Sequence, residues 1–277
     1  MLLLRRAVLQ TAALLVVQPR LPSYAADSDA ALFARLSQPM LNSPGVSPNR
    51  DQPLLPSYLA GRWSCTQTLQ QFTTPLGANF IGAPGRPPSE AEASAAETRR
   101  QIGKPVELEL RFNAVDGGAI EDRAFNAGSR LDAFAGRKVT RSAEACEATG
   151  SLDVLAAQPV ACTAVEFLGP VTQRILVNSQ RVAAAPDGAR IVSSEFQRSV
   201  FARRVQSDDK RNFPPIVTDS EVLLEVEAPK AGASDDRLVG RLRLASYLQP
   251  LDPLYFAADK KAVSISDYSV ELRRIAS

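Results

Sequence analysis

The chain has 277 residues, 45% hydrophobic and 22% charged, values typical of a globular protein with a substantial core. It contains no histidine, which excludes Ser-His-Asp and Cys-His catalysis and histidine-bound metal sites. Without the first 25 residues, 29 basic residues stand against 30 acidic ones, and this balance excludes the basic surface of a nucleic-acid-binding protein.

Residues 1–25 have the order of a cleaved export signal. Arg5 and Arg6 precede an apolar stretch from Ala7 to Val17, and a small-residue cleavage site ends at Ala25. The apolar stretch is too short to cross ~30 Å of hydrocarbon as a helix, and no later stretch is long enough either. The paired arginines resemble a twin-arginine signal, although the Sec route stays open. We therefore expect an exported mature chain without a transmembrane segment.

Residues 26–57 are predicted to form an extended N-terminal segment. Five prolines interrupt them, and only the stretch from Leu32 to Leu36 favours a short helix. The folded domain is predicted to span residues 58–277. The prolines are Pro39, Pro44, Pro48, Pro53 and Pro56.

The rest of the chain is dominated by alternation of apolar and polar residues. From Val106 to Phe112 every second residue is apolar and the residues between are charged, which predicts a half-buried antiparallel strand. The same pattern marks residues 63–72, 165–167, 171–177, 222–226, 238–244 and 268–275. Short loops favour a meander of about eight to ten strands, which could form a sandwich or a barrel. We favour a single antiparallel β-barrel.

Two short helices are expected within this domain. Ser89 and Glu92 form a capping-box pattern before an alanine-rich stretch, and Gly103 follows as a stop signal, so a helix is predicted from Ser89 to Ile102. A second helix is predicted from Ser129 to Phe134.

The segment from Thr73 to Pro88 is rich in glycine and proline, yet it carries the apolar residues Leu76, Phe80 and Ile81. Such a segment could be a lid over the mouth of a barrel, with Leu76 and Phe80 against a ligand. The alternative is a loop whose apolar side chains cover the core.

Charged residues gather from Asp122 to Arg137. A surface joined by ion pairs is the favoured interpretation, and an anion or head-group site containing Arg130 is the alternative. Acidic residues on the strands alternate with core positions and should face solvent, so none is selected as a glycosidase pair. We expect no catalytic residue, no metal site and no cofactor.

Three cysteines lack the C-x-x-C spacing of zinc or redox sites. Cys146 and Cys162 lie near two neighbouring strands, and an oxidising compartment could join them. A disulfide requires Cα atoms within about 7 Å, and the turn register is unknown, so the pairing is left open. Cys65 is predicted to be a buried apolar side chain.

Gly61-Arg62-Trp63 opens the first predicted strand and resembles the Gly-x-Trp signature of lipocalin-like (calycin) barrels. That resemblance implies a tryptophan that closes one barrel end beneath a ligand cavity, with a late arginine packed on it. Arg273 and Arg274 lie where such an arginine would be. A buried indole is usually structural, so core packing is the favoured role of Trp63, and direct contact with ligand is the alternative.

Four further blocks in the same order resemble an uncharacterised domain family of cyanobacteria and plastids, whose members are similar to thylakoid-lumen proteins. The blocks are residues 59–63, 72–77, 80–82 and 130–136. The resemblance implies a compartment, the thylakoid lumen or a periplasm, and a photosynthetic source. It brings no catalytic residues and does not separate a cyanobacterial from a plastid origin.

Three functions follow as hypotheses. The first is a non-enzymatic β-barrel that binds a small hydrophobic ligand, such as a lipid fragment, a pigment or a quinone, with Trp63, Leu76, Phe80 and Arg130 as candidate contacts. The second is an assembly module for a thylakoid membrane complex, acting through the N-terminal segment and the loop from Thr73 to Pro88. The third is an enzyme that works without histidine.

Overall fold

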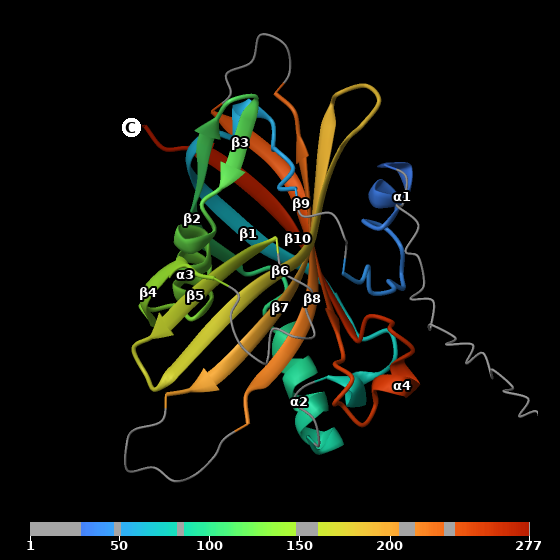
Figure 1. The fold of residues 1–277 in the computed structure, drawn as a ribbon. Coiled ribbons are helices and arrows are strands. Elements are labelled where there is room, and N and C mark those ends of the chain that lie inside the picture. The colour runs from blue at the N-terminus through green and yellow to red at the C-terminus, as the bar shows by residue number, and fades with distance from the viewer. Residues whose placement is uncertain are drawn as a thin grey trace, which may run out of the picture.

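The computed structural model describes residues 29–46, 51–81, 86–147, 160–204, 214–229 and 236–276. The predicted export signal, residues 1–25, lies outside them. The ten strands of the described residues form one antiparallel sheet in the order β3-β2-β1-β10-β9-β8-β7-β6-β5-β4 (Figure 1). The strands are Gly61–Thr73 (β1), Pro105–Val115 (β2), Gly118–Glu121 (β3), Thr140–Ala145 (β4), Ala161–Phe167 (β5), Val171–Ala184 (β6), Arg190–Arg203 (β7), Ile216–Glu227 (β8), Arg237–Tyr247 (β9) and Ser264–Arg274 (β10).

The sheet curls into an open half-barrel, so the predicted mostly-β class and meander are confirmed, but the closed barrel is not. β3 and β4 are the two edges of the sheet, and they do not pair with each other. The helix α3 (Arg123–Phe134) lies between them in the chain and packs against β2 on one side and against β4 and β5 on the other. The Ser129 hydroxyl accepts a hydrogen bond from the Glu109 amide (3.0 Å), and the Asn126 side chain bonds both backbone groups of Arg111. Helix side chains therefore take the place of a closing strand along β2.

Predicted strands are present as β1, β2, β5, β6, β8, β9 and β10, and the sequence missed β3, β4 and β7. In β7, the polar residues Ser194, Glu195 and Arg198 are buried together with Val192 and Phe196. Because both faces of β7 are covered, burial does not alternate along it, and a pattern of alternating hydrophobicity cannot reveal such a strand.

The inner, concave face of the sheet carries the core around Trp63. Trp63 lies opposite Leu110 of β2 and Arg274 of β10 in the sheet register. Leu59, at the end of the short 3₁₀ helix η1 (Ser57–Leu59), and Leu272 pack in the same cluster. This apolar cluster fills one end of the half-barrel.

Residues 29–46, which precede the first strand, cover part of the outer face of the sheet. Within them, α1 (Asp29–Ala34) provides the short helix expected near Leu32. Leu32, Leu36 and Leu41 are buried against Phe196 and Ile265. The described part of the predicted proline-rich segment thus forms a second, smaller core on the sheet.

The helices differ from the prediction at their starts, and α2 (Pro88–Arg99) also ends at Arg99 rather than at Ile102. Pro88 opens α2, with Pro87 before it and no side-chain cap, so the predicted capping box at Ser89 does not form. Proline is suited to the first helical position because its φ is already helical and it has no N–H to satisfy. α3 begins at Arg123 rather than Ser129, because the Asp122 side chain caps it by accepting from the Phe125 amide (3.1 Å).

Two short elements complete the described part of the chain. η2 (Ala78–Phe80) lies in the glycine- and proline-rich loop after β1, and α4 (Tyr255–Ala258) lies between β9 and β10 at one end of the sheet (Figure 1). None of the helices in the described part of the chain combines the length and apolar character that crossing a membrane requires.

Candidate functional site

One cavity, of ≈ 330 Å³, lies where the ends of β8, β9 and β10 meet η2. Its walls come from three distant parts of the sequence, which the curl of the sheet brings together. The lining residues are Phe80, Ile81, Ile216, Val217, Thr218, Asp219, Ser246, Tyr247, Leu248, Gln249, Asp252, Val263 and Ser264.

The charges at this cavity are already neutralised or engaged. Both Asp219 carboxylate oxygens accept hydrogen bonds from the Arg198 guanidinium, at 2.9 and 3.0 Å. The Tyr247 hydroxyl donates to Glu221 on the outer face (3.0 Å). Burial raises the pKa of Tyr247 well above its usual value, and the Glu221 charge raises it further. Asp252 also lines the cavity, and its carboxylate accepts a hydrogen bond from the Leu254 amide (2.8 Å). The site therefore offers a largely apolar surface with one carboxylate, that of Asp252, at its wall.

Gln249 is the exception among the polar lining residues. Its side chain is 8% exposed, and its amide nitrogen Nε2 has no hydrogen-bond partner. A buried donor without an acceptor is costly. Nine buried side-chain atoms of the described residues lack a partner, and Gln249 Nε2 is the one among them that belongs to a residue lining either cavity. An acceptor oxygen supplied by a ligand or a water molecule would remove that cost.

A second cavity, of ≈ 540 Å³, lies at the opening of the half-barrel between β2, α3 and β4. Asp132 accepts hydrogen bonds from the Val139 and Thr140 amides (2.8 and 2.9 Å) and from Lys138 Nζ (2.7 Å). Burial raises the pKa of Asp132, but these hydrogen bonds outweigh it and lower the pKa to about 2. Its carboxylate therefore holds the start of β4 and is not available to a ligand.

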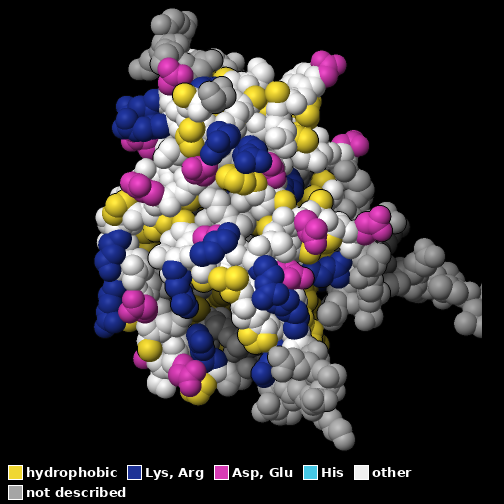
Figure 2. All heavy atoms as spheres, turned by 90° about the vertical axis from the view of Figure 1, so that its left-hand side faces the viewer, with side chains coloured by type: hydrophobic (Ala, Val, Ile, Leu, Met, Phe, Trp, Pro, Cys, Tyr) yellow, Lys and Arg dark blue, Asp and Glu magenta, His cyan; other side chains and the backbone are white. Residues whose placement is uncertain are grey.

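The other charged residues near this opening also pair with one another. Arg123 Nη1 lies 2.7 Å from Glu195 Oε2, and Arg130 Nη1 lies 2.9 Å from Glu121 Oε1. The Arg123 and Arg130 charges lower the pKa of Glu121 in spite of its burial. On this face Lys and Arg side chains are interspersed with Asp and Glu side chains (Figure 2). The favoured interpretation, a surface joined by ion pairs, is confirmed for these residues.

Only one of the four candidate ligand contacts lines a described cavity. Phe80 does so, whereas Leu76 lines neither cavity and Arg130 is paired with Glu121. Trp63 is fully buried: its indole N–H donates to Leu59 O (2.8 Å), and the Arg274 guanidinium lies 4.3 Å from its ring centre. The predictions of core packing and of a late arginine on the tryptophan are confirmed.

Sequence reasoning missed Gln249, the most informative residue of the cavity. Nothing around it distinguishes it from a surface glutamine, since it follows a strand and precedes Pro250. Only the fold buries its side chain.

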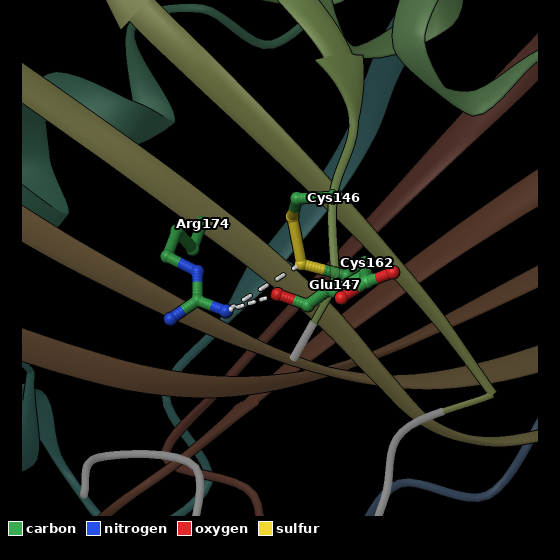
Figure 3. Close-up of a disulfide and its surroundings, with 4 residues drawn as sticks. All are labelled: Cys146, Glu147, Cys162 and Arg174. Atoms are coloured by element: carbon green, nitrogen blue, oxygen red, sulfur yellow. Dashed lines mark hydrogen bonds between the residues drawn. A yellow bond between two sulfur atoms is a disulfide. The ribbon is translucent and has the colours of Figure 1, made fainter. Parts of the chain in front are cut away.

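Cys146 and Cys162 form a disulfide with Cα atoms 5.1 Å apart, which answers the pairing left open above (Figure 3). It joins the end of β4 to β5, and Arg174 of β6 donates to the neighbouring Glu147 O (2.9 Å). Cys65 is buried as predicted, and burial raises the pKa of its thiol to about 11, so it is a poor nucleophile. Among the residues that the structure describes, no group of three or more Cys, Asp or Glu side chains could hold a metal ion.

A family model described as a domain of unknown function (DUF6816) matches residues 53–276, so the chain belongs to this family. No curated protein and no solved structure matches the chain. The predicted membership of an uncharacterised family is confirmed at this level. The lipocalin link, the thylakoid compartment and the photosynthetic source stay predictions. Residues 29–46, which cover the outer face, precede the matched region.

Proposed function

We propose that this member of the DUF6816 family is a non-enzymatic binding protein that holds a small, largely apolar ligand in the cavity between Phe80 and Gln249. The observation that carries the proposal is a largely apolar cavity with one buried amide donor that lacks an acceptor. Apolar walls with a few placed polar groups are typical of small-molecule sites.

The polar groups indicate the chemistry of the ligand. Gln249 Nε2 needs an acceptor, which an ammonium group cannot supply. The lining contains no Lys or Arg that could pair with an anion, and its acids are Asp219, which is paired with Arg198, and Asp252. A neutral molecule with one carbonyl or hydroxyl oxygen on an apolar body fits best. The volume of ≈ 330 Å³ is at the small end of ligand sites, which favours a lipid fragment or a quinone ring over a whole pigment.

The compartment belongs to the proposal as well. A disulfide between Cys146 and Cys162 suits an oxidising compartment such as the thylakoid lumen or a periplasm, in agreement with the export signal predicted at residues 1–25. Isolation of the native protein with residue 26 as its N-terminus would test this.

The assembly-module hypothesis has less support. It relied on an N-terminal segment free to bind a membrane complex, but Leu32, Leu36 and Leu41 are buried on the sheet. The part of the segment that the structure describes is therefore occupied within the molecule.

A matched ligand series tests the binding proposal. The mature chain, residues 26–277, would be titrated with 2-nonanone, nonane and nonanoate, and binding followed by calorimetry and NMR shifts. We expect saturable binding of the ketone, weaker binding of the alkane and the weakest binding of the carboxylate. Gln249→Leu should remove the preference for ketone over alkane, because it removes the donor.

Two variants of the same loop provide the control. Phe80→Ala should weaken ketone binding about tenfold, since it removes part of the apolar wall. Leu76→Ala should leave it unchanged, because Leu76 lines neither cavity. No saturable binding, or equal effects of the two variants, would refute the proposed site.

A further inference from the structure

We infer that the loop after β9, residues 248–259 (the docking loop), inserts its apolar tips into the surface of a lipid bilayer, and that the adjoining cavity takes its ligand from that membrane. The second half of this inference rests on the proposed function, whereas the first half does not. The loop includes α4 and lies at one end of the sheet (Figure 1).

Two side chains of the docking loop are unusually exposed. Leu251 is 84% exposed and Phe256 86%. The other exposed large apolar side chains of the described residues reach at most 55%, at Leu168. Single exposed apolar residues are normal. Two apolar side chains that are almost completely exposed on one short loop indicate a contact surface.

The backbone of the loop is ordered by its own hydrogen bonds, so a fixed framework presents these side chains. The Asp252 amide donates to Gln249 O (2.8 Å), and the Tyr255 amide donates to Asp252 O (3.0 Å). The Leu254 amide donates to the Asp252 carboxylate (2.8 Å), and Pro250 and Pro253 have no N–H. These groups are satisfied before any contact with lipid, and unsatisfied backbone groups are what makes entry into a bilayer costly.

The charges around the loop fit a bilayer surface. Exposed Lys260 and the partly exposed Lys261 directly follow it. Lysine stems can lie along the apolar boundary while the ammonium groups reach the lipid phosphates. The acids Asp252 and Asp259 balance these two charges, and Lys261 Nζ lies 3.5 Å from Asp259 Oδ2. Binding should therefore depend mainly on apolar insertion and little on the charge of the lipid.

The docking loop also forms part of the cavity wall. Leu248, Gln249 and Asp252 belong to both, and the half-exposed Ile216 lies on the same wall. With Leu251 and Phe256 in the bilayer, the cavity lies at the membrane surface. A poorly soluble ligand could then reach Gln249 without crossing bulk water.

Vesicle flotation tests the docking. The mature chain would be mixed with vesicles of pure phosphatidylcholine and with vesicles containing 30% phosphatidylglycerol. We expect binding to both, with affinities within about threefold, since the net charge of the loop region is near zero. The double variant Leu251→Ser, Phe256→Ser should bind at least tenfold more weakly. Both side chains are exposed, so the fold should be unaffected.

The matched control is Leu54→Ser, Leu168→Ser, which removes two exposed apolar side chains outside the docking loop and should bind vesicles like the wild type. No binding to protein-free vesicles, equal losses in both double variants, or binding only to native membranes with intact surface proteins would overturn the inference. The last outcome would indicate a protein partner.

A ketone titration separates this inference from the proposed function. The docking-loop double variant should bind 2-nonanone in solution like the wild type, because neither substituted side chain lines the cavity. If the wild type binds the ketone but not vesicles, the docking inference is refuted and the proposed function is not. Vesicle binding without ketone binding would refute the cavity as a ligand site.

Discussion

The two ends of the half-barrel differ in how completely they are filled. At the Trp63 end, the indole N–H has a carbonyl acceptor, and Arg274 both stacks on the ring and donates to Ala60 O (2.6 Å) and Tyr58 O (2.9 Å). At the other end there is a cavity, the Gln249 amide lacks a partner, and Leu251 and Phe256 face solvent. Tyr58 Oη and Gln67 Oε1 near the filled end also lack a partner, so an unsatisfied group does not by itself indicate a binding site. What sets the other end apart is that its unsatisfied amide belongs to a residue that lines a cavity.

The largest effect is expected at the filled end. Trp63→Ala should lower the free energy of unfolding by about 3–5 kcal/mol, because it leaves a cavity in the core. Urea denaturation measures this loss. At a temperature at which the variant is folded, its affinity for 2-nonanone should equal that of the wild type. A folded Trp63→Ala protein without ketone affinity would show that the two ends are not independent.

A buried ion pair on the outer face offers a second test. Arg35 pairs with the fully buried Glu221, with one hydrogen bond from Arg35 Nε of 2.8 Å. Arg35→Met should lower the free energy of unfolding by about 3 kcal/mol, because it leaves a buried carboxylate without its cation. Ser194 and Tyr247 still donate to Glu221 and limit the loss.

Limited proteolysis should then cleave residues 29–46 faster in Arg35→Met. The double variant Arg35→Met, Glu221→Leu should regain most of the stability, because no buried charge is left. If the double variant is as unstable as the single one, the ion pair is not the cause.

Reduction of the disulfide should lower the free energy of unfolding by up to about 3 kcal/mol. Cys146 and Cys162 are 16 residues apart, and closing a loop of this length in the unfolded chain is worth about that much. Denaturation with and without dithiothreitol measures it, and Cys146→Ser, Cys162→Ser should behave like the reduced protein. Ketone binding should persist, because the disulfide lies outside the cavity. Loss of ketone binding on reduction would show that the disulfide and the cavity are not independent.

The smallest effect concerns Asp132 and appears as a pH dependence. Its folded pKa of about 2 is below the ordinary value of 3.8, so the ionised carboxylate stabilises the fold above about pH 4. This contribution, roughly 2 kcal/mol, is lost as the pH falls towards 2. In Asp132→Asn, the difference in unfolding free energy between pH 7 and pH 2.5 should shrink by about 1.6 kcal/mol, because part of the contribution is still present at pH 2.5. Asp116→Asn, at an exposed position, controls for the change in net charge. If it reduced the pH dependence of the unfolding free energy as much as Asp132→Asn does, the effect could not be assigned to the hydrogen bonds of Asp132.

Much of the fold could be predicted because half-buried strands have an alternating apolar and polar sequence pattern. The alternation in β2, β8 and β9 reports one face in the core and one near water. β7 was missed because residues 29–46 and the inner core cover both of its faces, so polar residues such as Glu195 and Arg198 are buried there by pairing. The closed barrel was wrong because α3, not a strand, satisfies the edge of β2.

The candidate site was only partly predictable. Phe80 stood out as an apolar residue in a loop of glycines and prolines, and it does line a cavity. Leu76 is an apolar residue of the same loop, but it lines neither cavity. The disulfide needed a Cα distance that the sequence could not supply.

Composition and local pattern alone determined the absence of histidine chemistry, the near-balance of acidic and basic residues and the antiparallel β class, because each depends on residue types or on short-range periodicity. The tertiary structure decided the open half-barrel, the docked N-terminal segment, the cavity and the orphan amide of Gln249. Each of these depends on residues tens to hundreds of positions apart, such as Phe80 and Gln249, which come together only when the sheet curls. Burial without a partner is a property of the assembled fold, and no local pattern in the sequence encodes it.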